Sequence, residues 1–304
     1  MQEDAEQALS LEGSKRLLRH VYRVRENRRH ILDRVPFILR WGKWRKKTER
    51  QVLADWAGGY VLFNERDYLY LPAGMDTMST HYLIRPAEAK ATVQNFCPPG
   101  GTAIDIGANY GEWTVQMARA VGPAGKVYAF EPVQALAGCV QKTMDVNGLK
   151  QTEIVALATS NKDGQASFPV NLDHSGRSGF GQSHAGDAII EISVKTVKLD
   201  SFVRERQINR LDFLKIDVEG HESEVLEGAQ NILRDLKPAL VLEVGINPDQ
   251  DREKIHGLLT GLNYRMIGIL LPHGMAEGDW KSYRARTGPF GTDFINVLFV
   301  ADTM

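Results

Sequence analysis

Three side chains that can carry a proton follow one short apolar run in the second half of the chain. Asp217, Glu219 and His221 lie directly after the run at 211–216. If that run is a buried parallel strand, the three side chains emerge at its carboxyl end, the edge where open α/β sheets bind ligands. A carboxylate or an imidazole at that edge could remove the proton from a hydroxyl group as the oxygen attacks an electrophilic carbon. We therefore take all three as candidate catalytic bases.

The same residues allow other interpretations. His221 has an unperturbed pKa of about 6.5, which suits proton transfer, but it is explained equally well as a residue at the start of a helix with a surface hydrogen bond. Glu219 and Glu222 are explained equally well as carboxylates at the positive end of that helix. A divalent metal site is a further possibility, because these side chains could converge with Glu243 in the next buried run. Asp217 and Glu243 are the ligands that we expect if such a site exists.

A glycine-rich stretch at 101–131 predicts the element that binds a ligand beside these residues. It reads GTAIDIGANYGEWTVQMARAVGPAGKVYAFE, which indicates a buried strand, a turn, a helix at 112–121 and a second strand that ends at Glu131. Such a βαβ unit places an approachable backbone, a helix N-terminus and a carboxylate for a ribose diol at one edge. That combination suits a cofactor that contains adenosine.

The turn differs in two residues from the phosphate-binding turn of dinucleotide folds. Asn109 stands where the second glycine of G-x-G-x-x-G would let the backbone approach a pyrophosphate. Asp105, two residues before the first glycine, suits an ammonium group better than a phosphate. S-adenosylmethionine has an ammonium group and a ribose but no phosphate, so it is the cofactor that we expect. The alternative is a glycine-rich turn that only packs a helix on a sheet.

Length and composition are those of an ordinary globular protein. The 304 residues are 43% hydrophobic and 25% charged, enough to bury a full core in one domain with additions or in two small domains. No apolar run reaches the roughly eighteen residues that span a bilayer, and no leader pattern is present, so we expect a cytoplasmic location. Cys97 and Cys139 have no spacing that suggests zinc or a disulfide, and we expect buried thiols.

Basic residues are concentrated near the N-terminus. Residues 15–50 hold fourteen Lys or Arg and three Asp or Glu, and their apolar residues recur at helical spacing. We expect a basic amphipathic arm over residues 1–50. One interpretation packs it on the domain or on a second subunit, as in a homodimer. A second attaches it to an anionic membrane surface, peripheral to the inner membrane. Nucleic-acid binding is the third and the least favoured, because no recognition module is present.

Hydrophobic patterns place the remaining elements. Short strands at 60–63 and 68–71 predict a small β cap, and a helix at 86–96 leads into the first core strand. Further strands are expected at 152–157, 165–170, 189–197, 239–244, 266–271 and 296–300, and helices at 133–147, 199–205, 222–236 and 250–262. Two segments without a pattern, 171–187 and 272–292, are expected to be surface loops near the site, the first as a lid.

Five sequence blocks carry a resemblance to a known family. In order they are DIGANYGEWT, AFEP, SVKTVKLDSF, LDFLKIDVEGHESEVLEGA and LVLEV. With them the chain resembles the FkbM family of S-adenosylmethionine-dependent methyltransferases over residues 98–300. The most specific part is KIDVEG followed by E-x-x-V-L-x-G-A, and the basic arm lies outside the resemblance.

The resemblance implies a fold and a set of binding residues. The fold is the class I methyltransferase fold, which is Rossmann-like α/β with a seven-stranded sheet whose last strand is antiparallel. We divide the chain into the arm at 1–50, the β cap and connecting helix at 51–97, and the methyltransferase domain at 98–304. The residues that would bind the cofactor by this likeness are Asp105, Gly107, Ala108, Asn109 and Gly111 at the methionine end, Glu131 and Pro132 near the ribose, Ala156 and Leu157 beside the adenine, and Asp217 at the active site.

Many members of the family methylate hydroxyl groups, which gives the function that we expect. It is O-methylation of a sugar, a glycan, or a glycosylated or polyketide-type metabolite, in natural product or glycan biosynthesis. Three alternatives stay open: an RNA methyltransferase that uses the basic arm, a nicotinamide-dependent reductase, and a non-catalytic scaffold that binds adenosine. Each would respond differently to salt, to NADPH and to S-adenosylhomocysteine.

Overall fold

The computed structural model describes most of the chain after the arm. The described residues are 58–63, 66–73, 90–172, 174–180, 188–245, 250–271, 274–281 and 294–302. The arm at 1–50 lies outside them, as do residues 181–187 and 282–292 of the two expected loops. In the part that is described, no helix is both long enough and apolar enough to cross a membrane.

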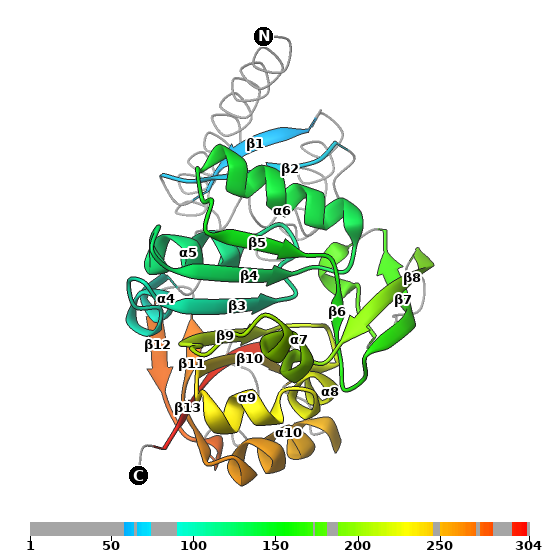
Figure 1. Cartoon of the computed structure of the whole chain (residues 1–304). Coiled ribbons are helices and arrows are strands. Elements are labelled where there is room, and N and C mark those ends of the chain that lie inside the picture. Colours follow the sequence, from blue (N-terminus) through cyan, green and yellow to red (C-terminus); the bar gives the residue numbers. More distant parts are fainter. Residues whose placement is uncertain are drawn as a thin grey trace, which may run out of the picture.

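The central layer is an eight-stranded sheet with the strand order β12-β11-β13-β10-β9-β3-β4-β5 (Figure 1). Its strands are β3 (Thr102–Ile106), β4 (Lys126–Phe130), β5 (Thr152–Val155), β9 (Phe213–Ile216), β10 (Ala239–Gly245), β11 (Tyr264–Leu271), β12 (Gly274–Glu277) and β13 (Phe294–Ala301). Strands β5, β4, β3, β9 and β10 pair parallel with one another in that order, whereas β13 pairs antiparallel with both β10 and β11. Apart from β12, this is the expected seven-stranded sheet with its last strand antiparallel. The predicted fold class is confirmed.

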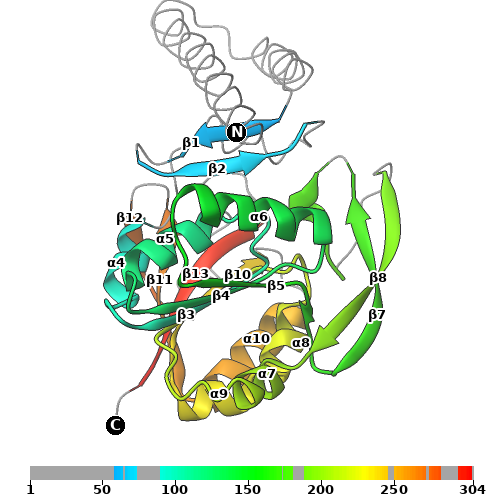
Figure 2. The ribbon, with the colours of Figure 1, turned by 45° about the horizontal axis from the view of Figure 1, so that its top comes forward.

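Helices cover both faces of this sheet (Figures 1 and 2). One face carries α4 (Lys90–Phe96), α5 (Glu112–Val121) and α6 (Gln134–Val146), and the other carries α7 (Leu199–Glu205), α8 (Glu222–Glu227), α9 (Gln230–Asp235) and α10 (Gln250–Gly261). Alternate residues of one strand enter the two cores, as Ala103 and Ile104 of β3 do. The inner strands are therefore apolar on both faces, which is why they appear as short apolar runs.

Three segments differ from the expectation in more than the exact end residues of an element. The helix expected at 222–236 is two helices, and the break falls at Gly228, where an added Cβ would lie 2.1 Å from the carbonyl oxygen of Ser160. The strand expected at 152–157 ends at Val155, and the chain then enters another sheet. The segment at 272–292 was expected to be a loop, but its first part forms β12, which pairs antiparallel with β11.

A two-stranded sheet lies where the β cap was expected. Its strands are β1 (Gly59–Leu62) and β2 (Tyr68–Leu71), which pair antiparallel. The backbone N–H of Tyr70 donates to Thr143 of α6 over 2.9 Å, and the buried carboxylate of Asp67 pairs with Arg119 of α5 over 2.6 Å. Val61 and Leu69 belong to the same apolar cluster as residues of α5 and α6. The cap thus shares its core with the helices that cover the main sheet.

A three-stranded wing stands beside the carboxyl end of the main sheet (Figure 1). Its strands are β6 (Ala158–Thr159), β7 (Gly164–Asn171) and β8 (Ile189–Val197), in the order β6-β8-β7. Strands were expected at 165–170 and 189–197, where β7 and β8 lie, but β6 was not expected, because two residues are too few to show alternation. A short 3-10 helix, η2 (Ser175–Arg177), follows β7 and brings the chain over the sheet edge.

Candidate active site

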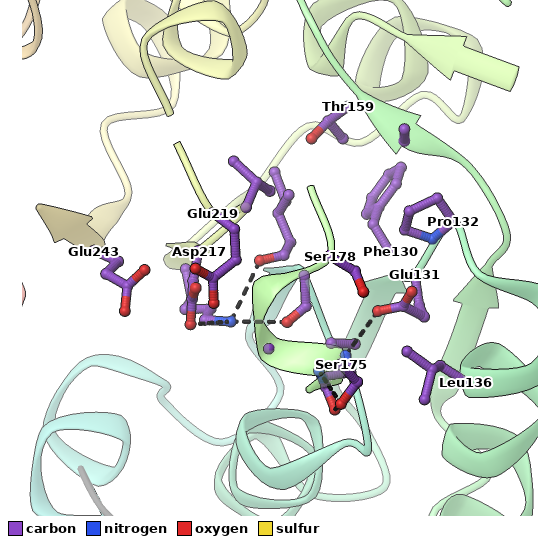
Figure 3. A pocket seen from close by; sticks show the side chains of 18 of the residues that line it. Phe130, Glu131, Pro132, Leu136, Thr159, Ser175, Ser178, Asp217, Glu219 and Glu243 are labelled. Atoms are coloured by element: carbon purple, nitrogen blue, oxygen red, sulfur yellow. Dashed lines mark hydrogen bonds and ion pairs between the residues drawn. The ribbon is translucent and has the colours of Figure 1, made fainter. Parts of the chain in front are cut away.

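A pocket of about 240 Å³ opens at the carboxyl end of the parallel strands (Figure 3). Its walls come from the turn after β3, the residues that follow β4 and β9, the ends of β10 and β13, the start of the wing, and the segment around Ser175. The volume is several times the roughly 30 Å³ that one water occupies in the liquid, so an organic ligand can enter. This is the edge where the sequence predicted the site.

The glycine turn brings the backbone after β3 against the backbone after β9. Gly107 has a φ of +79°, and an added Cβ would lie 1.8 Å from the carbonyl oxygen of Asp217. No residue with a side chain fits there without moving one strand end. Gly107, Ala108 and Asn109 line the pocket, whereas Gly111 stands at the N-cap of α5 and does not. Gly111 therefore shapes the turn from behind.

Glu131 lies where a ribose-binding carboxylate was expected, at the end of β4. It is buried and lines the pocket together with Pro132. Its Oε2 accepts a hydrogen bond from the N–H of Asn109 over 2.9 Å, and its Oε1 accepts one from the N–H of Val133 over 3.0 Å. A carboxylate offers about four acceptor positions, so both oxygens can still accept a hydroxyl. Burial raises the pKa of Glu131 to about 7, although the two backbone hydrogen bonds lower it.

The apolar side of the pocket lies between the end of β4 and the wing. Phe130, Leu157 and Phe168 line it, and Leu157 is one of the two residues that were expected beside the adenine. Ala156, the other, was expected there but is exposed and lies outside the lining. The chain turns tightly at Ala156, because the N–H of Leu157 donates to the carbonyl oxygen of Val155 over 2.8 Å, so Ala156 does not share the wall that Leu157 lines.

Asp105 does not face the pocket, which corrects its expected contact with a cofactor ammonium group. It is fully buried, accepts a hydrogen bond from Thr114 of α5, and lies 3.6 Å from the Nζ of Lys215. Burial raises the pKa of Asp105, and the charge of Lys215 and the bond from Thr114 oppose that rise. The ammonium group beside Asp105 thus belongs to the protein itself.

Lys215 is the functional residue that the sequence analysis missed. It lies in β9, is buried, and its Nζ contacts the carbonyl oxygen of Gly107 at 2.9 Å and the Oδ2 of Asp217 at 3.2 Å. Burial alone would lower the pKa of Lys215, but the charges of Asp217 and Asp105 outweigh it and hold that pKa above the ordinary value. A charged residue inside the apolar run at 211–216 was the available signal.

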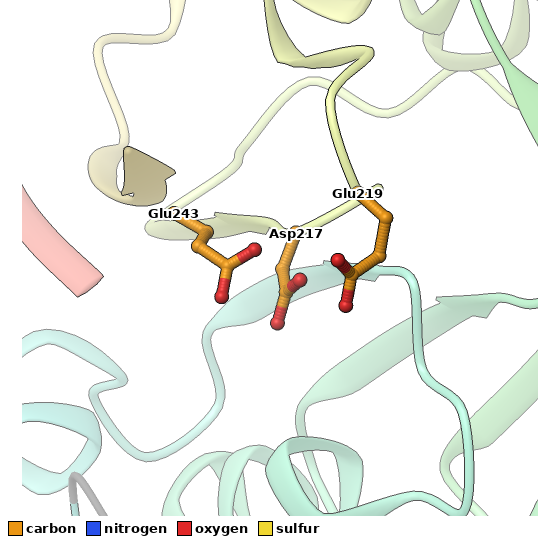
Figure 4. A group of neighbouring side chains, drawn as sticks. All are labelled: Asp217, Glu219 and Glu243. Atoms are coloured by element: carbon orange, nitrogen blue, oxygen red, sulfur yellow. The ribbon is translucent and has the colours of Figure 1, made fainter. Parts of the chain in front are cut away.

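Three carboxylates converge at the other end of the pocket (Figure 4). Asp217, Glu219 and Glu243 each contribute one carboxylate oxygen, and these three oxygens all lie within 4.8 Å of one another. Burial, with Asp217 as the nearest like charge, raises the pKa of Glu219 to about 9 and holds that of Glu243 well above its usual range. The set could hold a divalent cation, as the sequence allowed, and Lys215 already provides one positive charge beside it.

Two buried oxygens near these carboxylates lack a hydrogen-bond donor. They are the Oε2 of Glu243 and the Oδ1 of Asn296, neither of which is bonded to any described residue. Both residues line the pocket and sit opposite each other on β10 and β13. Buried acceptors without a donor cost free energy, so a ligand with O–H or N–H groups would find partners here. Asn296 carried no sequence signal, because only the strand register brings it to Glu243.

His221 lies outside the pocket, and the structure favours its interpretation as a helix-terminal residue. It is the N-cap of α8, its Nε2 lies 3.0 Å from the Oγ of Ser160, and its Nδ1 lies 3.4 Å from a carboxylate oxygen of Glu224. Its ring also packs on Phe180. Glu222 likewise accepts hydrogen bonds from two backbone N–H groups of its own turn. We therefore withdraw His221 as a catalytic base.

The described part of the expected lid covers the pocket. Ser175 and Ser178 line it, and Asn109 reaches Ser175 over 3.3 Å between its Nδ2 and the Oγ. Gly179 lies so close to the turn after β9 that an added Cβ would be 2.6 Å from the carbonyl oxygen of Val218. The segment 174–180 is therefore packed against both ends of the site.

Comparison with known proteins gives the following relatives. The model of the FkbM methyltransferase domain matches residues 105–266. "Methyltransferase 1" of Beauveria bassiana is 25% identical over an alignment of 164 residues that covers 48% of this chain and 66% of that protein. The chain thus spans just under two thirds of that relative.

Two solved structures are similar to parts of this chain. The FkbM methyltransferase of Methylobacillus flagellatus has 15% identity and a TM-score of 0.41, over 66% of this chain and 43% of that one. Fibrillarin of Aeropyrum pernix, solved with S-adenosylmethionine, has 13% identity and a TM-score of 0.42, over 70% and 73% of the two chains. Because the family model covers more than half of the chain, the protein belongs to the FkbM methyltransferase family.

Proposed function

We propose that the protein is an S-adenosylmethionine-dependent O-methyltransferase. Its acceptor would be a hydroxyl of a sugar, a glycan, or a glycosylated or polyketide-type metabolite. The observation that carries the cofactor is the lack of a cation available to phosphates among the described lining residues. The one described cation in the lining, Lys215, is already paired with Asp217, and the lining also holds five carboxyl groups, of which Glu219 and Glu243 have pKa values raised well above the usual range. Such a pocket offers no positive charge to the phosphates of a nicotinamide dinucleotide and suits a ligand with a sulfonium and an ammonium group.

The chain's own residues divide into a cofactor end and an acceptor end. At the cofactor end, Glu131 accepts hydrogen bonds from ribose hydroxyls, and the backbone of Gly107 and Ala108 allows close approach. When bound, S-adenosylmethionine supplies a methyl group on a positively charged sulfur. Holding an acceptor oxygen in line with that methyl group lowers the barrier, by up to roughly 7–11 kcal/mol in favourable cases.

At the acceptor end, one carboxylate must take the proton of the attacking hydroxyl. We assign this role to Asp217. Glu219, with its pKa at about 9, is largely protonated at neutral pH and is a poor base there, and His221 lies outside the pocket. Glu243 and Asn296 offer buried acceptor oxygens to neighbouring hydroxyls of the substrate. A polyhydroxylated acceptor satisfies such atoms, which supports a sugar.

The test combines cofactor binding with transfer of a labelled methyl group. Calorimetry should detect binding of S-adenosylhomocysteine and none of NADPH. Incubation with methyl-labelled S-adenosylmethionine and separate glycan, lipid and RNA fractions should label the glycan fraction, and Asp217→Asn should abolish labelling without abolishing cofactor binding. Label in RNA that weakens steeply with salt would favour the RNA methyltransferase. Absence of S-adenosylhomocysteine binding would refute the proposal.

The basic arm leads us to propose that the acceptor lies at an anionic membrane surface. Its positive charge, on residues 15–50, would concentrate anionic surfaces near an enzyme whose pocket is acidic. Deletion of residues 1–50 should then reduce association with vesicles that contain phosphatidylserine. Unchanged association would remove the membrane interpretation and would leave the methyltransferase proposal intact.

A further inference from the structure

We propose that Lys215 is a positioning residue that holds the cofactor turn and the acceptor carboxylate in one fixed arrangement. This inference rests on the proposed function and adds a residue that neither the motifs nor the family match assigns to a role. Its Nζ is the one described cation that contacts both ends of the site, the carbonyl oxygen of Gly107 at 2.9 Å and the Oδ2 of Asp217 at 3.2 Å.

The position of this ammonium group follows from the register of two strands. Lys215 and Asp105 are partners in the parallel pair of β9 and β3, and both point to the face that carries α5. Two residues further along the chain from Lys215, Asp217 reaches the sheet edge, where its N–H donates to the carbonyl oxygen of Ile106. The side chain of Lys215 rises from the core to this edge and ends between the two strand ends.

The two strand ends approach each other closely beside this ammonium group. The position of a Cβ on Gly107 lies 1.8 Å from the carbonyl oxygen of Asp217 and 3.8 Å from the Nζ of Lys215. The peptide groups therefore touch directly, and the ammonium group bonds to both sides of that contact. Because Asp217 retains a partly exposed side chain, at 26%, the bond from Lys215 restricts a carboxylate that would otherwise sample several rotamers.

A second role competes with this one. Lys215 also neutralises Asp105, which is fully buried 3.6 Å away, and an unpaired buried carboxylate destabilises a fold strongly. Loss of activity on removal of Lys215 would by itself fit either role. The two roles separate only in a variant that removes both charges of the buried pair.

The experiment compares Lys215→Met with the double variant Asp105→Asn/Lys215→Met. The single variant should lose thermal stability and affinity for S-adenosylhomocysteine. The double variant has the net charge of the wild type and no carboxylate at position 105, and the amide that replaces that carboxylate can still accept the hydrogen bond from Thr114. It should regain most of the stability, while its affinity for S-adenosylhomocysteine stays about tenfold or more below that of the wild type, the size expected for a lost bond to a charged group.

Each outcome decides between the roles. Wild-type affinity in the double variant would show that Lys215 only neutralises Asp105 and would overturn the proposal. Failure of the double variant to fold would assign Lys215 to stability and would overturn it as well. Absence of S-adenosylhomocysteine binding in the wild type would instead refute the proposed function, so the two failures can be told apart.

Discussion

The affinity for S-adenosylhomocysteine should depend on pH through Glu131. Its carboxyl group is buried in the pocket, and burial raises its pKa to about 7. The ionised form is the better acceptor for ribose hydroxyls, because a protonated oxygen becomes a donor. Raising the pH from 6 to 8 should therefore convert Glu131 to its binding form and strengthen cofactor binding.

The size of the effect follows from the ionised fraction. With a pKa of about 7, roughly a tenth of Glu131 is ionised at pH 6 and roughly nine tenths at pH 8. The apparent Kd is the intrinsic Kd divided by the competent fraction. It should fall about tenfold over this range, which corresponds to about 1.4 kcal/mol. Stability should change the other way, because a carboxyl with a raised pKa contributes stability at low pH that is lost as the pH rises through about 7.

Calorimetric titration at pH 6, 7 and 8 measures the first effect, and two variants isolate its source. Glu131→Gln should bind more weakly than the wild type at pH 8 and should show no pH dependence. Glu222→Gln is the matched control, since burial also raises the pKa of Glu222 to about 7 but its side chain lies outside the pocket lining. It should keep the tenfold change. A wild-type Kd that is independent of pH, or a Glu131→Gln variant with the same pH dependence as the wild type, would refute the assignment.

Three further expectations concern the turn and the carboxylates. Gly107→Ala should lower the free energy of unfolding by about 3 kcal/mol more than Gly122→Ala in denaturant titrations, because both glycines have positive φ but only at Gly107 would the new Cβ meet backbone; equal losses would contradict the close approach. Glu219→Gln should raise the Tm at pH 8 by at least about 2 °C, since the pKa of Glu219, raised to about 9, means that deprotonation destabilises the fold; an unchanged or lower Tm would argue that Glu219 is already ionised. Exhaustive treatment with EDTA should leave the affinity for S-adenosylhomocysteine within about twofold, because Lys215 already supplies a positive charge at the carboxylate cluster; a larger loss would indicate a bound divalent ion.

The sequence was sufficient for the parts of the fold that depend on local pattern. The apolar runs of β3, β4 and β9 are buried on both faces, so their composition alone predicts inner parallel strands. The glycine turn at Gly107 and the carboxylate of Glu131 were predictable because both depend on positions next to a strand end. The seven-stranded sheet with its antiparallel last strand followed from the family resemblance, and no local feature of the chain could have supplied it.

Side-chain direction and long-range partners were beyond the sequence. Asp105 was expected to face a ligand, but its partner Lys215 is distant in the chain and meets it only through the register of β3 and β9. His221 was expected to be a base, but its Nε2 lies 3.0 Å from the Oγ of Ser160, which is distant in the chain. Both errors have one cause, because a pattern tells which residues share a face but not which distant residue lies opposite.

The buried pair of Asp105 and Lys215 bears on why the site has this form. A buried ion pair is seldom a source of stability, because desolvation of both charges offsets their attraction, and apolar residues of similar volume often serve the fold as well or better. The neighbours of the pair in the same apolar cluster, Ala103 and Phe213, are such residues. A charge pair in the middle of this apolar layer is therefore poorly explained by folding. The pair is better explained by the site at the edge of the sheet, because the ammonium group that Asp105 stabilises is the one that contacts Gly107 and Asp217 there. Asp105 therefore acts on the proposed cofactor site indirectly, by stabilising the charge of Lys215 in the core beneath it.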